Sequence, residues 1–238
     1  MANEFIARNG LVAQANSQIT GSLSQGSGIS TIGSASHAEG INTFSSGQYS
    51  HAEGNNTESS GIYSHAEGYG TQSPGNSSHA EGDQTIASGD YSHTEGNVYQ
   101  GAGGDIYTVA SGVGSHAEGR GTLASGISSH AEGSSTDDGD TINYPLSARG
   151  NFSHAEGVGT TSHGGGSHAE GYRTVSSGSY SHAEGNLTIA SGSYSHAEGN
   201  DTISTGEGSH AEGFSTNAIG NYSHTEGWGT VASGSYQH

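Results

Sequence analysis

The sequence is poor in several residue types on which folded proteins usually rely. Its 238 residues include no cysteine, two prolines and one tryptophan, and only 28% are hydrophobic. Without cysteine there is no disulfide and no thiolate metal site. The hydrophobic share lies far below the ~45–50% of ordinary domains, which excludes a conventional core of large aliphatic side chains. No run approaches the ~18 apolar residues of a membrane-spanning helix, so we expect no membrane insertion.

Positive charge is also scarce. The chain has four basic residues, all of them arginine, and its formal net charge is −19. Such a surface repels a phosphate backbone, so we expect no nucleic-acid partner. The first ten residues contain no basic segment followed by an apolar run, and no secretory signal peptide is predicted there.

Glycine, in contrast, is abundant, and it belongs to a repeat. The motif Ser-His-Ala-Glu-Gly recurs every 14 residues, with Thr in place of Ala in two copies. Two intervals are longer, at 23 and 24 residues, and indicate insertions at about 98–106 and 137–146. The period is too short for helix-pair repeats of ~33–47 residues. The His and Glu of the motif are His37, Glu39, His51, Glu53, His65, Glu67, His79, Glu81, His93, Glu95, His116, Glu118, His130, Glu132, His154, Glu156, His168, Glu170, His182, Glu184, His196, Glu198, His210, Glu212, His224 and Glu226.

The glycines divide each repeat into two arms. With the motif histidine as position 0, glycine stands at +3 and almost always at +10. The arms between them have strand length, which predicts two short strands and two turns per coil. We therefore predict an all-β parallel β-solenoid, or β-roll, with 14 residues per coil. The expected organisation is an N-terminal attachment segment at 1–34 and the roll at 35–238.

Strand alternation predicts which side chains face inward. Positions −1, +1, +6 and +8 hold Ser, Ala, Thr and a small residue, and these should line the narrow interior. Position 0 (His) and position +2 (Glu) then point outward on one face as a His/Glu ladder. Position +7, often apolar, points out of the other arm, and position −2 in the turn is often aromatic. So little internal apolar volume, together with an exposed apolar stripe, indicates an oligomer.

The motif resembles a known repeat. Ser-His-Ala-Glu-Gly followed by Thr-x-Ala-Ser-Gly, as at 85–89 and 188–192, is similar to the head repeat of YadA-type trimeric autotransporter adhesins, which has Ser-Val-Ala-Ile-Gly in that place. The similarity extends over about 36–238. It implies a left-handed parallel β-roll assembled as a parallel homotrimer. In that family the two outward positions of the first arm largely face the trimer interior, so the resemblance places the His/Glu ladder at the interface.

The N-terminal stretch at 4–23 resembles a different group of proteins. It contains Phe-Ile-Ala-Arg-Asn-Gly-Leu and Gln-Ile-Thr-Gly-Ser-Leu, which are similar to the start of bacteriophage tail-fibre and appendage proteins. Such fibres often continue into a C-terminal chaperone domain that is cleaved off after assembly. The resemblance implies a virion component.

The ladder allows more than one chemistry. Imidazole and carboxylate are both metal ligands, but a His and a Glu two residues apart on a strand supply only two donors. We expect a self-complementary hydrogen-bonded ladder and no cofactor, with ions on a three-fold axis and a solvent-exposed stripe as the alternatives. Beside glutamate, the histidine pKa should rise above ~6.5 and the glutamate pKa should fall below ~4.3. A neutral, desolvated histidine that donates to glutamate is the competing expectation.

Catalysis is not indicated. In Ser-His-x-Glu the serine should point inward and the histidine outward, so the motif is no triad, and we expect no enzyme. The insertions are the better candidates for individual sites, because insertions in repeats become surface loops. The acidic residues of the second could bind Ca²⁺ or form a solvated loop. The candidates are Tyr99, Asp105, Asp137, Asp138, Asp140 and Tyr144.

Two functions fit these observations. The first is a non-catalytic structural fibre segment of a phage or prophage tail appendage, in contact with a bacterial surface glycan or another receptor. The alternative is the head of a trimeric adhesin on the bacterial cell surface that binds a host or matrix ligand. The absence of a predicted signal peptide favours the virion, since an adhesin must be exported. An ice-binding solenoid is disfavoured because the aligned threonines at +6 should point inward.

Overall fold

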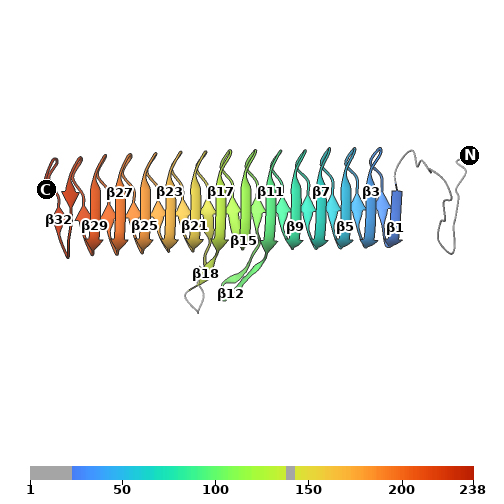
Figure 1. Cartoon of the computed structure of the whole chain (residues 1–238), viewed down its shortest axis with the longest axis horizontal. Helices are drawn as coiled ribbons and strands as arrows, with labels where there is room; N and C mark the ends of the chain where they lie inside the picture. Colours follow the sequence, from blue (N-terminus) through green and yellow to red (C-terminus); the bar gives the residue numbers. More distant parts are fainter. Residues whose placement is uncertain (1–22, 138–142) are drawn as a thin grey trace, which may run out of the picture.

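The molecule is a long, narrow β-solenoid (Figure 1). The computed structural model describes residues 23–137 and 143–238. In these ranges the chain forms two parallel 14-stranded sheets and two short hairpins, and no helix is present that could cross a membrane. The predicted all-β parallel solenoid with two strands per coil is confirmed.

The first sheet carries the motif, and its strands follow one another along the solenoid axis. They are β1 (Leu23–Ser27), β3 (His37–Ile41), β5 (His51–Asn55), β7 (His65–Tyr69), β9 (His79–Asp83), β11 (His93–Asn97), β15 (His116–Arg120), β17 (His130–Ser134), β21 (His154–Val158), β23 (His168–Tyr172), β25 (His182–Asn186), β27 (His196–Asn200), β29 (His210–Phe214) and β31 (His224–Thr225).

The second sheet contains the shorter strands of the second arm. They are β2 (Ser30–Thr31), β4 (Phe44–Ser45), β6 (Glu58–Ser59), β8 (Gln72–Ser73), β10 (Ile86–Ala87), β14 (Val109–Ala110), β16 (Thr122–Ala124), β20 (Leu146–Ala148), β22 (Thr161–Ser162), β24 (Val175–Ser176), β26 (Ile189–Ala190), β28 (Ile203–Ser204), β30 (Asn217–Ala218) and β32 (Val231–Ala232). The hairpins are β12 (Tyr99–Gly101) with β13 (Gly104–Ile106), and β18 (Thr136–Asp137) with β19 (Asn143–Tyr144).

Every coil stacks on the next in exact register, so like lies on like. His168 pairs with His182, and the neighbouring Ala and Glu positions pair in the same way. The insertions do not disturb this register, because the coils on either side still pair His93 with His116. Both insertions leave the roll as hairpins, as expected for additions to a repeat.

The roll begins before the motif does. Strands β1 and β2 already form a complete coil, with Leu23 beside His37 and Gln25 beside Glu39. The first coil therefore starts at Leu23, twelve residues ahead of the motif-based boundary at 35. The rest of the expected attachment segment, residues 1–22, lies outside the described residues.

The interior consists of small side chains, as the alternation predicts. Ala183 at +1 and Ala190 at +8 are fully buried, and so are Thr188 at +6 and the serines at −1. Hydroxyl groups bridge the two arms: Ser176 Oγ lies 2.6 Å from Ser181 Oγ. Leu146 is the one large aliphatic side chain that is fully buried in the described part of the chain. It takes the +6 position of its coil, so the second insertion ends before Leu146.

Glycine is required at two places in each coil for different reasons. At +3, Gly185 has φ +110°, and a Cβ there would also collide with the carbonyl oxygen of Gly199 in the next coil. At +10, Gly192 has no unusual φ, but a Cβ would collide with the carbonyl oxygen of Gly206. The second glycine therefore serves close stacking of backbones rather than turn geometry.

An aromatic edge runs along the turn at −2. Tyr63 occupies the left-handed region at φ 57°, and its N–H donates to the carbonyl of Gln48 in the preceding coil. The aromatic residues at this position are exposed, and some stack on each other, such as Tyr49 on Tyr63 with ring centroids 5.0 Å apart. The apolar residues at +7, such as Ile189, are half-buried.

The dense interior gives a test of the inward-facing assignment. Replacing Ala183 with Leu should lower the free energy of unfolding by ~1–3 kcal/mol or more, because the interior has no space for three further carbon atoms. The measurement is urea denaturation followed by circular dichroism. Ser179→Leu is the matched control, since the equivalent turn positions of other coils hold the exposed Ile62, Val113 and Ile127. Equal effects of the two changes would contradict the assignment.

Candidate functional site

The His/Glu ladder, defined as the histidines and glutamates of the motif, covers the outer face of the first sheet. From His37 to His224 the imidazole rings stack face to face, with centroids 4.7–4.9 Å apart and interplanar angles of 0–22°. The spacing equals that of the coils, so the regular backbone register sets the geometry of the ladder. The predicted outward direction of both side chains is confirmed, since each is about one-third exposed.

Each histidine faces a carboxylate but does not bond to it. In twelve pairs the Nε2 atom lies 3.4–3.9 Å from a glutamate oxygen, beyond the 2.7–3.2 Å of an N–H···O hydrogen bond. In most pairs the glutamate belongs to the same coil, whereas His79 and His93 face the glutamate of the preceding coil. Every one of these Nε2 atoms is enclosed and has no hydrogen-bond partner among the described residues.

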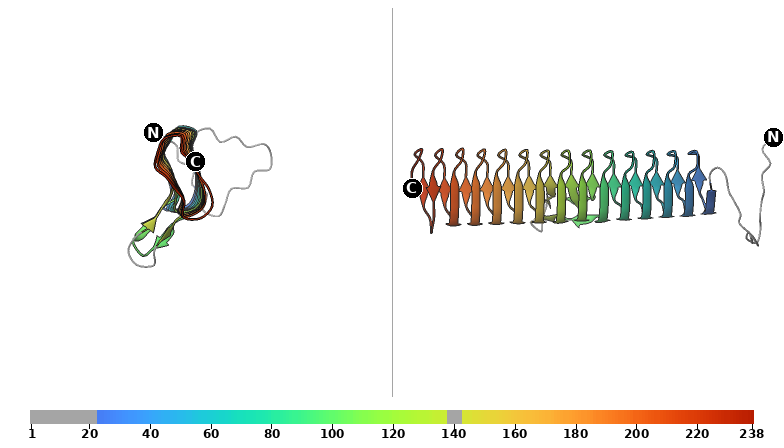
Figure 2. Two further views of the ribbon diagram at one scale, coloured as in Figure 1. Left: turned by 90° about the vertical axis from the view of Figure 1, so that its left-hand side faces the viewer. Right: turned by 45° about the horizontal axis from the view of Figure 1, so that its top comes forward.

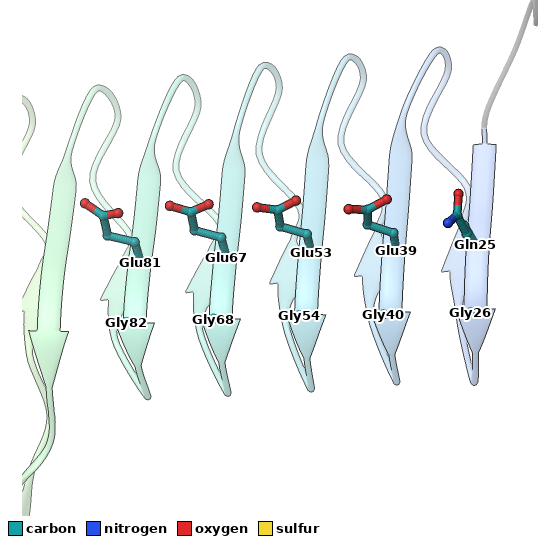
Figure 3. Close-up of a pocket in the computed structure, with 10 residues that line it drawn as sticks. All are labelled: Gln25, Gly26, Glu39, Gly40, Glu53, Gly54, Glu67, Gly68, Glu81 and Gly82. Atoms are coloured by element: carbon teal, nitrogen blue, oxygen red, sulfur yellow. The ribbon is translucent and has the colours of Figure 1, made fainter.

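The glutamates line an open trough along the roll (Figure 3). At its N-terminal end the trough contains Glu39, Glu53, Glu67 and Glu81, with Gln25 of the first coil beyond them. The glycine at +3 follows each glutamate and has no side chain, so the floor beside the carboxylates stays free. The result is a row of carboxylates that solvent or a second surface can reach.

The stacked histidines titrate in the direction opposite to the first expectation. The pKa values of five ladder histidines lie below the usual range, because burial disfavours the imidazolium and, for each of them, at least one neighbouring histidine repels its charge. The nearby glutamates act against this shift without overcoming it. The expectation of raised histidine pKa values is therefore wrong for His65, His116, His154, His168 and His196. The competing expectation of a neutral imidazole agrees with these directions.

Neighbouring glutamates share protons instead of all ionising. The hydrogen bond with Glu95, together with burial, raises the pKa of Glu118 to about 7, and the same bond lowers the pKa of Glu95. Burial, and then hydrogen bonds with Glu170 and Glu198, raise the pKa of Glu184 to about 7. A protonated carboxyl between two carboxylates removes one negative charge and supplies a donor. The expected lowering of glutamate pKa values therefore holds for some rungs and fails for others.

The inward serine separates the motif from nucleophilic chemistry. Ser181 Oγ donates to the carbonyl oxygen of Gly178 inside the roll, whereas His182 lies on the outer face. The two side chains point to opposite sides of one strand, so they do not form a nucleophile–base pair. Ligand groups do converge on the outer face: nine groups such as His154, Glu156 and His168 have donor atoms within 4.8 Å of one another.

The second notable feature is the hairpin spur, formed by β12–β13 and β18–β19. Both hairpins leave the same edge of the roll, and Figure 2 shows them projecting together when the solenoid is seen end-on. The amide of Ala102 donates to Asp137 Oδ2 at 3.0 Å, and Asn143 Nδ2 donates to the carbonyl of Gly104 at 3.0 Å. Two insertions separated in sequence thus form one composite projection.

Two of the rare arginines attach the spur to the roll. The Arg120 guanidinium lies 4.6 Å from the centroid of the Tyr99 ring, and that of Arg173 lies 3.5 Å from the Tyr144 ring. Such cation–π contacts also bury the tyrosine rings. Composition could have indicated these residues, because positive charge is scarce and both arginines follow the insertions closely in sequence. The sequence analysis did not identify Arg120, Arg173 or Asn143.

The loop candidates from the sequence have different positions. Tyr99 is buried under Arg120, Asp105 is exposed opposite Gln100, and Tyr144 lies under Arg173. Asp137 accepts the hydrogen bond from the first hairpin, so it acts there as a structural acceptor. Asp138 and Asp140 lie outside the described residues, so the proposed acidic Ca²⁺ trio is not assembled here.

The chain matches no protein-family model and no curated protein sequence. The argument for a function therefore depends on the ladder, the spur and the solenoid itself.

The titration of the ladder predicts how stability depends on pH. Histidines with a lowered folded pKa favour folding above ~6.5, and this advantage is lost as pH falls through the folded value. The lowered pKa of Glu95 acts in the same direction, with its advantage lost below ~4.5. Glu118 and Glu184, with pKa about 7, oppose this, because their contribution is present below ~4.5 and lost as pH rises through 7.

We therefore expect the melting temperature to rise from pH 4.5 to about 6.5 and to change little or fall slightly above pH 7. The measurement is a series of thermal melts at fixed ionic strength in metal-free buffer. In Glu118→Gln the decline above pH 7 should be smaller, because the amide keeps its donor and cannot ionise. A melting temperature that falls steadily between pH 5 and 7 would contradict the assigned directions.

Proposed function

We propose that this chain is a rigid, non-catalytic segment of a trimeric fibre, and specifically of a phage or prophage tail appendage. The observation that carries the proposal is the outer face of the first sheet: thirteen enclosed histidine nitrogens, regularly spaced along the roll, have no hydrogen-bond partner. Buried polar atoms are rarely left unpaired in a finished assembly. A face of this kind is suited to contact with further copies of the same ladder.

The mechanical properties fit a shaft. Two continuous parallel sheets extend along the whole described roll, and each coil adds about 4.8 Å, so fourteen strands per sheet span roughly 60 Å. The interior is made of Ala, Ser and Thr with a single buried leucine, which gives little hydrophobic stabilisation to one chain. Association would supply the missing burial.

The trimer is supported by the resemblance to YadA-type head repeats. That family forms left-handed parallel rolls that trimerise through the face that holds the His/Glu ladder here. In this chain the same positions are polar, so the contact would consist of hydrogen bonds and shared protons between copies. The raised pKa of Glu118 and Glu184, about 7 for each, indicates carboxyl groups that can donate as well as accept.

The spur favours a recognition function for one part of the shaft. It is the projection that interrupts an otherwise uniform described surface, and the exposed tyrosines at −2 supply aromatic edges nearby. In a phage appendage this surface would face a bacterial glycan or another receptor, and the location would be the virion. The same feature supports the alternative, the head of a trimeric adhesin at the bacterial cell surface with a host or matrix ligand.

Oligomeric state and interface can be tested together. Light scattering at micromolar concentration should give three chain masses. Because the chain has no cysteine, single-cysteine variants report proximity cleanly. Glu184→Cys should form disulfide-linked dimers under mild oxidation if the ladder lies at the three-fold axis, whereas the exposed Ser179→Cys should stay reduced. A single chain mass would contradict the proposed trimer, and a trimer without the Glu184→Cys cross-link would place its interface elsewhere.

A further inference from the structure

The ladder has the donor geometry of a metal-binding array. We propose that it binds divalent ions of the zinc class, each held between one histidine Nε2 atom and one glutamate oxygen. The inference goes beyond the fibre function and does not depend on the trimer, because both donors come from one chain. It starts from the unpartnered Nε2 atoms, which are enclosed and directed at the carboxylates.

The distances between the donors match the size of the ion. Zinc bonds to imidazole nitrogen and carboxylate oxygen at about 2.0–2.2 Å, so two donors of a tetrahedral ion lie about 3.4 Å apart. The pairs in the ladder lie 3.4 Å apart for His93 and Glu81 and 3.6 Å apart for His130 and Glu132. The widest pairs, at 3.9 Å, need a movement of about half an ångström. These separations are too long for a hydrogen bond and close to the requirement of a bridging ion.

The spacing of the rungs limits how the ions are held. Successive imidazole rings lie 4.7–4.9 Å apart, which exceeds the roughly 4.2 Å that two nitrogens can span across one ion even when all three atoms are in line. Each ion therefore takes one histidine and one glutamate from the chain, and its remaining positions belong to water or to another copy. Ions on adjacent rungs repel one another, so occupation of about every second rung is expected.

The donor set also selects the kind of ion. An imidazole nitrogen beside a carboxylate suits Zn²⁺, Co²⁺, Ni²⁺ and Cu²⁺, whereas Mg²⁺ and Ca²⁺ prefer oxygen donors alone. Ions of the first kind would engage the enclosed nitrogens and would also offset part of the formal charge of −19. A general acidic surface would bind any divalent cation, and this difference separates the ladder from diffuse attraction.

The test is equilibrium dialysis of the full chain, without an affinity tag, against Co²⁺ or Zn²⁺ at neutral pH, followed by metal analysis. We expect about six ions per chain, one for every second of the twelve pairs, and no displacement by a hundredfold excess of Mg²⁺. Fewer than one ion per chain, or displacement by Mg²⁺, would overturn the proposal.

Matched variants locate the ions. The ladder variant replaces four consecutive carboxylates and should bind about one-third fewer ions. The control variant removes the same number of charges from exposed sites outside the ladder and should bind as many ions as the native chain. Equal losses would mean diffuse attraction and would overturn the proposal. The ladder variant is Glu132→Gln, Glu156→Gln, Glu170→Gln and Glu184→Gln, and the control is Glu58→Gln, Asp83→Asn, Asp105→Asn and Glu207→Gln.

A second measurement needs no variant, in case the ladder variant fails to fold. X-ray absorption of the zinc-loaded native chain should show nitrogen or oxygen donors at about 2.0 Å together with the outer-shell scattering of imidazole. Spectra with oxygen donors alone would overturn the proposal. Light scattering of the same samples reports the trimer independently, so failure of the metal site and failure of the fibre assembly give different results.

Discussion

The structure depends on how closely consecutive coils approach at their glycines. At +3 and +10 the space for a side chain is occupied by the carbonyl oxygen of the next coil, as at Gly185 and Gly192. Any larger residue at either place would push two coils apart and break hydrogen bonds in both sheets. Because the approach repeats every 14 residues, all coils are held at one spacing and in one register. Every identical residue therefore lies above and below a copy of itself.

This stacking of like on like decides the electrostatics of the outer face. A histidine in an isolated strand would have a glutamate as its main neighbour, and its pKa would rise. In the roll each ring also has an imidazole on both faces at 4.7–4.9 Å, so a second positive charge is repelled from either side. Burial acts in the same direction, and for His65 it is the largest cause of the lowered pKa. The glutamates have the corresponding problem and relieve it by sharing protons, as Glu118 does with Glu95.

Most of the fold follows from the period, but several features of the site do not. The glycine spacing predicts the two arms, and alternation within each arm correctly predicts the buried Ala183 and the outward His182. The direction of the histidine pKa was missed because the reasoning paired each histidine with the glutamate of its own strand and neglected the neighbouring coils. The spur was missed because pairing of Ala102 with Asp137 requires both insertions to leave the same edge, which local sequence does not specify. The first coil was missed because Leu23 and Gln25 replace the residues that define the motif.

Those two replacements have a physical consequence for the end of the ladder. A stack of like charges is least screened by protein where it stops, and the terminal pair has a neighbour on one side only. In the first coil Leu23 lies beside His37 and Gln25 beside Glu39, so the ladder meets a neutral coil that continues its hydrogen-bonded strand without adding charge. The glutamine keeps the length and polarity of glutamate and remains in line with the carboxylates (Figure 3). The degenerate coil thus covers the edge of the first motif-bearing strand, as terminal repeats of solenoids commonly do, while it ends the run of charge.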